Sequence, residues 1–154
     1  MLITTSEFID SGVPISNDIS TAEITMAIDT VENFYLKSQI TDANYIDLET
    51  NPTEAKNYIL LNGGVIDDVK YAGLKKALYH LVFGYLLMDL YRITRYSSVE
   101  KTSEFSKSVT REDLFSQGRT HWEIGMAYVE EVQNYYGLDT KHNDKNNLFE
   151  TLYF

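Results

Sequence analysis

The chain has 154 residues, of which 44% are hydrophobic and 23% are charged, a balance typical of a single globular domain. It contains no cysteine, which excludes disulfide bonds, thiolate metal sites and cysteine nucleophiles. Only two prolines and eight glycines favour long uninterrupted helices over a β-sandwich with many turns. The composition therefore predicts a soluble, mainly α protein.

The charge is strongly acidic and unevenly distributed. Asp and Glu number 23 against 13 Lys and Arg, which gives a net charge of −10. Residues 1–68 carry −10, residues 69–119 carry +4 and residues 120–154 carry −4. This balance disfavours nucleic-acid binding, which needs a basic face. Two interpretations stay open: the charge provides solubility, or the acidic end pairs with the more basic middle of another copy.

No segment has the pattern of an export signal or a membrane span. The first residues lack the basic start and apolar run of a signal peptide. The most apolar stretch, 77–90, has only 14 residues and contains His80 and Asp89, whereas a bilayer needs about 20 apolar residues. We therefore expect a protein made in a cytoplasm, with no membrane partner.

The first part of the chain predicts an extended lead-in followed by a long helix. Residues 1–19 contain Gly12 and Pro14, which interrupt regular structure. Ser20 and Glu23 have the spacing of a capping box, and the helix that they begin is expected to end near Thr41. Its predicted apolar face consists of Ile24, Ala27, Ile28, Val31, Phe34, Tyr35 and Ile40, and its polar face of Asp29, Glu32 and Asn33.

The middle of the chain predicts two short helices and one long one. Residues 43–49 form the first, and Asn51 with Pro52 marks the start of a second, which ends at Gly63. Asp68 is the expected cap of the long helix that follows. That helix runs to about residue 96, and its apolar residues cover more than half of its circumference, which is typical of a helix buried on several sides.

The last part predicts an arm, a helix and a tail. Residues 97–109 alternate in polarity, as an extended arm or weak β-hairpin does. A helix follows from Thr110 to Gly137, with Gly118 and Gly125 on its apolar seam, where we expect another backbone to approach closely. Residues 138–154 form an extended C-terminal tail that ends in aromatic residues. The predicted organisation is thus a helical bundle over 20–137 that carries the arm, with a lead-in and a tail.

Motifs that would indicate an enzyme are absent. The chain has no phosphate-binding glycine loop, nucleophile elbow or zinc-protease helix. We expect His80 to be a hydrogen-bonded core histidine, His121 and Glu123 to lie on different helix faces, and His142 to be solvated. The pair Asp67-Asp68 lacks the alternating carboxylates of a calcium loop. The sequence therefore predicts a non-enzyme without catalytic, cofactor-binding or metal-binding residues.

The arm and the tail are the expected partner-binding elements. An isolated extended arm cannot satisfy its backbone hydrogen bonds, so we expect it to become ordered against a partner; a surface loop and a frayed end are the alternative. Twelve tyrosines also suit a surface that is covered on assembly, and Tyr135, Tyr136 and Tyr153 are expected near it. The predicted partner-binding residues are Val99, Lys101, Phe105, Lys107 and Val109 in the arm and Phe149, Leu152, Tyr153 and Phe154 in the tail.

The order of several phrases resembles a known family. YLKSQITDANYIDL begins at Tyr35, NYILLNGG at Asn57 and YAGLKKALYHLVFGYLL at Tyr71, before the extended segment and the last helix. This order resembles that of small head–tail connector (adaptor or ring) proteins of tailed bacteriophages, particularly phages of Bacteroides-type gut bacteria, including crAss-like phages. Ser38 stands where the family phrase has proline, whereas the phrase from Leu60 to Leu78 follows the family pattern more closely.

The resemblance implies a structural role at the head–tail junction of a virion. Such proteins form a ring, commonly of twelve copies, between the portal protein and the next tail or ring protein, and DNA passes through the lumen without specific binding. No cofactor is implied. The alternatives are a tail-completion protein of the same particle, a monomeric helical regulator that binds a host protein, and a small enzyme whose site is assembled in space.

Overall fold

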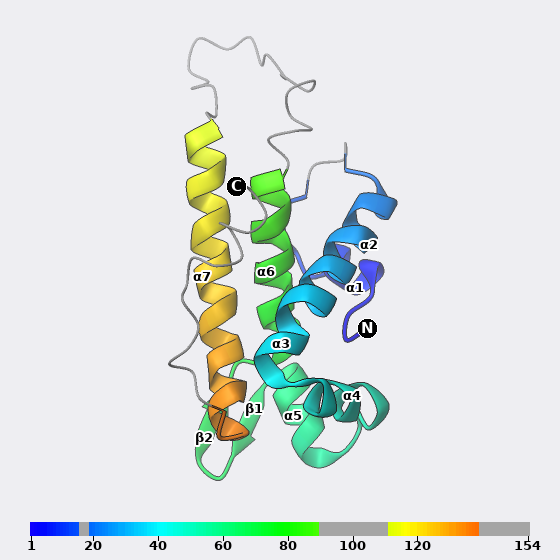
Figure 1. The fold of residues 1–154 in the computed structure, drawn as a ribbon, viewed down its shortest axis with the longest axis vertical. Coiled ribbons are helices and arrows are strands. Elements are labelled where there is room, and N and C mark those ends of the chain that lie inside the picture. The colour runs from blue at the N-terminus through cyan, green and yellow to red at the C-terminus, as the bar shows by residue number, and fades with distance from the viewer. Residues whose placement is uncertain (16–18, 90–110, 139–154) are drawn as a thin grey trace.

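Two long antiparallel helices form the centre of the molecule. The computed structural model describes residues 1–15, 19–89 and 111–138, which are mainly helical. Helix α6 (Leu74–Asp89) packs along α7 (Arg111–Tyr135), and this is the most extensive contact between any two elements of the described residues. Figure 1 shows the helices of residues 5–40 beside α6. The short helices of residues 42–62 and the hairpin of residues 64–71 lie at one end of the pair. The predicted mainly α fold is confirmed.

Glycines allow α6 and α7 to approach closely. A Cβ at Gly125 would lie 2.6 Å from Cγ of Leu81, and one at Gly118 would lie 2.9 Å from the carbonyl oxygen of Gly84. The close backbone approach expected at Gly118 and Gly125 is therefore confirmed. The matching role of Gly84 was not predicted: its own Cβ would lie 2.7 Å from the carbonyl oxygen of Gly118.

The helix predicted from Ser20 forms, but it contains a wider turn. It comprises α2 (Thr21–Thr30), the π-helix η1 (Val31–Leu36) and α3 (Lys37–Ile40). The predicted capping box is present: the Ser20 hydroxyl accepts from the Glu23 backbone N–H at 3.3 Å, and the Glu23 carboxylate accepts from the Ser20 N–H at 2.7 Å. The helix ends before Thr41, as expected.

The π-helix changes which residues are buried. Pairs of buried residues recur every four residues in this segment, at 27–28, 31–32 and 35–36. This period is longer than the 3.6 residues of an α-helix turn, and the wider turn of a π-helix accommodates it. Glu32, expected on the polar face, is therefore buried, with 2% of its surface exposed. Phe34, expected on the apolar face, is 74% exposed. These two assignments were wrong because they assumed a regular α-helix throughout.

The expected extended lead-in is also wrong, because residues 5–10 form helix α1 (Thr5–Asp10). Thr4 and Glu7 make a second capping box, in which Glu7 accepts from the Thr4 backbone N–H at 2.7 Å. Leu2, Ile3 and Phe8 belong to the hydrophobic core. The first residues are thus an integral part of the folded domain.

Two short helices follow. The expected helix over 43–49 is α4 (Asp42–Thr50), and the next is α5 (Ala55–Asn62), which ends at Gly63 with a positive φ of 91°. Asn51 does not cap α5, because the N-cap position of this helix is occupied by Glu54. The Asn51 carbonyl oxygen instead accepts a hydrogen bond from the side chain of Asn57 at 3.2 Å. Pro52 accordingly lies in the turn before the helix.

A β-hairpin replaces the expected connection between α5 and α6. Strand β1 (Gly64–Ile66) pairs antiparallel with β2 (Val69–Tyr71), with Ile66 opposite Val69. The two turn residues, Asp67 and Asp68, have φ values of 48° and 65°, as a type I′ turn requires. The expectation that Asp68 caps a helix was wrong, since the two-residue turn places it in the left-handed region.

This turn makes a first prediction. Asp68→Gly should stabilise the protein by about 0.5–1 kcal/mol, because glycine adopts positive φ without the steric cost that a Cβ adds. Urea unfolding monitored by circular dichroism measures the change. A variant that unfolds at a lower urea concentration would contradict the turn assignment.

The last helix ends as predicted, with Gly137 at a φ of 66°. The Leu138 N–H donates to the Gln133 carbonyl oxygen at 3.0 Å, and the Gly137 N–H donates to that of Asn134 at 3.1 Å, a Schellman motif. All nine predicted partner-binding residues of the arm and tail lie outside the described residues, as do Thr110 and His142. None of the described helices combines the length and hydropathy that crossing a bilayer requires.

Candidate functional site

A pocket of about 270 Å³ lies where the α1–α2 connection meets α6 and α7. Residues from three separate parts of the chain line it: Ser11, Gly12, Val13 and Pro14 from the connection, Lys76, Tyr79, His80 and Phe83 from α6, and His121 from α7. Val13, Pro14, Tyr79 and Phe83 give it mainly apolar walls. Its polar side chains are basic or neutral, and no carboxylate of the described residues lines it.

Local structure explains how these residues meet. Positions 76, 79, 80 and 83 of α6 follow helical spacing and therefore share one face. Helix α1 is held against that face by Glu7, which accepts from Lys75 Nζ at 2.7 Å, and by the rings of Phe8 and Tyr79, whose centroids lie 6.3 Å apart. The chain then turns at Gly12, with a φ of 82°. The connection is thus placed across the α6 face.

The two histidines of the pocket form a direct pair. The Nδ1 atoms of His80 and His121 lie 3.0 Å apart, and the rings are nearly parallel at 21° with centroids 5.3 Å apart. Each Nδ1 must then lie on the side of its ring that faces the other ring, which is the arrangement of an N–H···N hydrogen bond. One Nδ1 carries a hydrogen and donates it in the hydrogen bond, and the other Nδ1 is the unprotonated acceptor. The two neutral rings are therefore different tautomers. Protonation of both rings would bring two N–H groups together and break this bond.

The surroundings disfavour charge on both rings. Partial burial, the neighbouring His121 and the Lys76 ammonium lower the pKa of His80, and partial burial lowers the pKa of His121. Tyr128 of α7 lies against the pair, with its ring centroid 5.9 Å from that of His80. The pair is therefore neutral at neutral pH.

The pair makes a second prediction, on pH. A histidine whose pKa is lower in the folded than in the unfolded state binds fewer protons when folded, so stability should fall as pH drops below the unfolded pKa of about 6.5. We expect the loss between pH 7 and pH 5 to be smaller in His80→Gln than in the parent chain. Thermal unfolding at each pH measures both slopes, and equal slopes would contradict the prediction.

The sequence predicted part of this site. His80 is hydrogen-bonded, as expected, but the expected core position is wrong, because His80 is only partly buried and lines the pocket. His121 contacts His80, whereas Glu123 is exposed and pairs with Arg119, so the two do not act together, as expected. The pairing of His80 with His121, 41 residues apart, was missed. Its only signal was that both residues occur on long helices of the predicted bundle, which does not fix the register between them.

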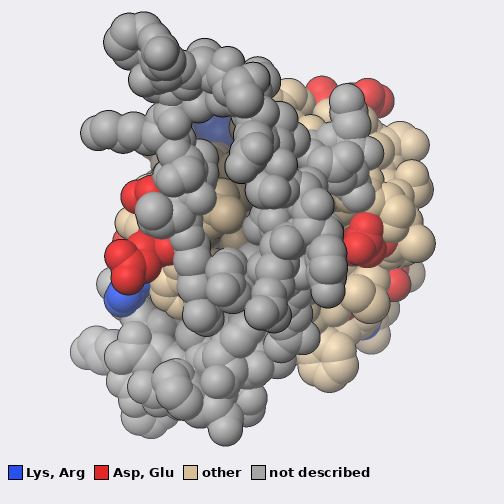
Figure 2. Space-filling view, turned by 90° about the horizontal axis from the view of Figure 1, so that it is seen from above, with Lys and Arg blue, Asp and Glu red and all other residues tan. Residues whose placement is uncertain are grey.

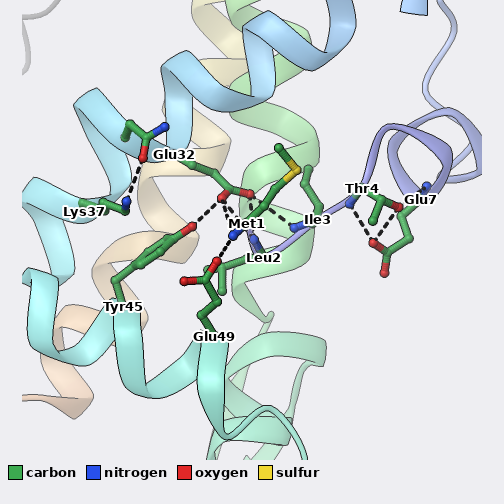
Figure 3. A network of polar contacts seen from close by, with 10 residues as sticks. Met1, Leu2, Ile3, Thr4, Glu7, Glu32, Lys37, Tyr45 and Glu49 are labelled. Atoms are coloured by element: carbon green, nitrogen blue, oxygen red, sulfur yellow. Dashed lines mark hydrogen bonds and ion pairs between the residues drawn. The ribbon is translucent and has the colours of Figure 1, made fainter.

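A buried carboxylate lies at a second place, between the N-terminal segment and α4. Glu32 accepts from the backbone N–H groups of Leu2 at 3.0 Å and Ile3 at 3.2 Å, and from the Tyr45 hydroxyl at 2.6 Å (Figure 3). The Met1 amino group lies 3.9 Å from Glu32 and also pairs with Glu49. Burial and the Glu32 carboxylate raise the pKa of Tyr45. The network is structural: every polar group in it has a partner, and it fixes residues 1–3 to the helices.

A third feature is an exposed stripe on α2, η1 and α3. Met26, Thr30, Phe34 and Ser38 recur every four residues, opposite the buried pairs, and we call them the α2–α3 stripe. Met26 is 58% exposed and Phe34 is 74% exposed. The stripe therefore presents two large apolar side chains to solvent, and Phe34 is the most exposed large apolar residue of the part that the structure describes.

Tyr135 and Tyr136 are half-buried, and the Tyr135 ring packs edge-on against Tyr71 at 5.9 Å between centroids. Within residues 1–15, 19–89 and 111–138, no three His, Asp or Glu side chains converge as a metal ion would need. Figure 2 shows Asp and Glu at several places on the described surface and fewer Lys and Arg.

Comparisons of the sequence with models of protein families, with curated proteins and with solved structures found no match.

Proposed function

We propose that this chain is a structural subunit of a head–tail connector ring of a tailed bacteriophage, joining the portal protein to the next tail or ring protein. The observation that carries the proposal is the exposed Phe34 and Met26 of the α2–α3 stripe. Large apolar side chains exposed on one face of a helix are available for contact with another molecule. The resemblance of the sequence phrases to connector proteins supports a neighbouring subunit as that other molecule.

The charge distribution supports contact between copies. Residues 1–68, which include the stripe, carry −10, and residues 69–119 carry +4. A ring requires a head-to-tail interface in which two different surfaces of the chain meet. An acidic surface facing a more basic one favours this arrangement over a two-fold dimer. The net charge of −10 also disfavours adhesion to DNA in a lumen.

The arm and tail complete the proposed assembly. Thirteen extended residues, the length of 97–109, reach about 40 Å, enough to cross onto a neighbouring small domain. Lys101 and Lys107 are placed in the sequence to meet an acidic neighbour, with Phe105 and the tail residues Phe149 to Phe154 as apolar anchors. Limited proteolysis should cut both segments in free subunits and spare them in the assembly. Equal cutting in both states would contradict this role.

The stripe is tested by analytical ultracentrifugation of matched variants. We expect the parent chain to sediment as a large closed oligomer and Phe34→Ser to shift it toward the monomer. Ile9→Ser is the control, because Ile9 is 47% exposed but lies on α1, outside the stripe. Equal sedimentation of Phe34→Ser and the parent would show that the stripe is not part of the interface. A parent chain that stays monomeric would favour a regulator that binds a host protein.

A further inference from the structure

The pocket where the α1–α2 connection meets α6 and α7 is lined by basic side chains, in contrast to the acidic net charge of the protein. Among the described residues, its lining contains one lysine and two histidines and no carboxylate. Lys76 lies with its Nζ 5.4 Å from the centroid of the Tyr128 ring, and no Asp or Glu among the described residues forms an ion pair with it. Its neighbour Lys75, by contrast, is paired with Glu7. Within the part of the chain that the structure describes, Lys76 is therefore a cation of the pocket that no carboxylate pairs with.

The walls of the pocket are mainly apolar. Val13 and Pro14 of the connection and Tyr79 and Phe83 of α6 contribute to its lining, and its volume of about 270 Å³ is close to the lower end of small-molecule sites. Apolar walls with a few polar groups are the usual form of such sites. Because the histidine pair is neutral at neutral pH, Lys76 supplies one full positive charge. A single charge matches a monoanion better than a dianion.

We propose that this pocket binds a small organic monocarboxylate, with its aromatic or branched apolar body between Pro14 and Phe83 and its carboxylate at Lys76 and the His80–His121 pair. This site is independent of the proposed ring interface. The pair can accept one proton while keeping its N–H···N bond, and the resulting imidazolium adds a second cation beside the carboxylate. Binding should therefore strengthen as the pH falls toward 6.

The groups that face the pair support this pH dependence. Lys76 and Tyr79 come from α6 and Tyr128 from α7, while the connection 11–14 contributes no titratable side chain. None of them is a carboxylate that would take up the proton instead. The gain in affinity should therefore follow the histidine pair.

Benzoate is the probe, titrated into the full chain by isothermal calorimetry, with benzyl alcohol as its neutral analogue. We expect saturable 1:1 binding of benzoate, about tenfold weaker binding of benzyl alcohol, and a benzoate affinity that is higher at pH 6 than at pH 8. Lys76→Met should weaken benzoate binding about tenfold without unfolding the chain, because Lys76 is exposed. Lys70→Met, on the hairpin outside the pocket, is the matched control and should bind as the parent does.

Three results would overturn the proposal. The first is the absence of saturable benzoate binding, and the second is equal binding of benzoate and benzyl alcohol, which would show an apolar pocket without anion recognition. The third is an equal loss in Lys76→Met and Lys70→Met, which would reflect net charge alone. None of these results bears on ring formation, so the two proposals fail separately.

Discussion

Replacing Glu32 with alanine should destabilise the protein by about 3–5 kcal/mol, because it leaves three buried donors without their shared acceptor. The Leu2 and Ile3 N–H groups and the Tyr45 hydroxyl would lose their acceptor inside the protein. A buried donor left without an acceptor costs about 1–3 kcal/mol, so the effect exceeds that of an ordinary surface change. Urea unfolding monitored by circular dichroism measures it.

Two variants separate this network from general effects of charge. Glu32→Gln keeps the size and one acceptor oxygen and should lose less stability than the alanine variant. Glu130→Ala removes an exposed carboxylate from α7 and should stay within about 0.5 kcal/mol of the parent. A loss below about 1 kcal/mol in Glu32→Ala would mean that the N-terminal segment does not depend on this carboxylate.

Gly84→Ala should destabilise the α6–α7 pair by about 1–3 kcal/mol through overpacking. The added Cβ would lie 2.7 Å from the carbonyl oxygen of Gly118 and 3.0 Å from the backbone nitrogen of Trp122. Both are backbone atoms, so relief requires the helices to move apart. Without this contact, alanine would stabilise the helix by about 1 kcal/mol relative to glycine. The contact therefore turns an expected gain in stability into a loss.

The matched control for Gly84→Ala is Gln117→Ala, an exposed position of α7. It should leave the melting temperature nearly unchanged, since alanine and glutamine have similar helix propensities. If the Gly84→Ala variant melts at or above the melting temperature of the parent chain, the two helices do not approach each other closely at Gly84.

Local rules predicted the helix ends well. Ser20 with Glu23 fixed the start of α2, and Gly63 and Gly137 marked the ends of two helices. Thr4 with Glu7 has the same capping spacing as Ser20 with Glu23, so α1 was visible in the sequence but was not recognised beside Gly12 and Pro14. In the same way, two adjacent aspartates suit a helix cap and a two-residue turn alike, and the structure places them in the turn.

Features that depend on tertiary packing were not predictable from local rules. Glu32 is buried and Phe34 is exposed because the segment forms a π-helical turn. No residue of that segment predicts such a turn. The His80–His121 pair requires the register between α6 and α7, which Gly84, Gly118 and Gly125 fix together. The partner-binding residues of the arm and the tail remain predictions, because they lie outside the described residues.

Electron microscopy of the purified full chain tests the proposed connector role most directly. Two-dimensional class averages of the parent chain should show closed rings of one size with an open lumen, and adding the portal protein of the same phage should cap one face of each ring. Particles that never close into rings, at any protein concentration and with the portal present, would contradict it.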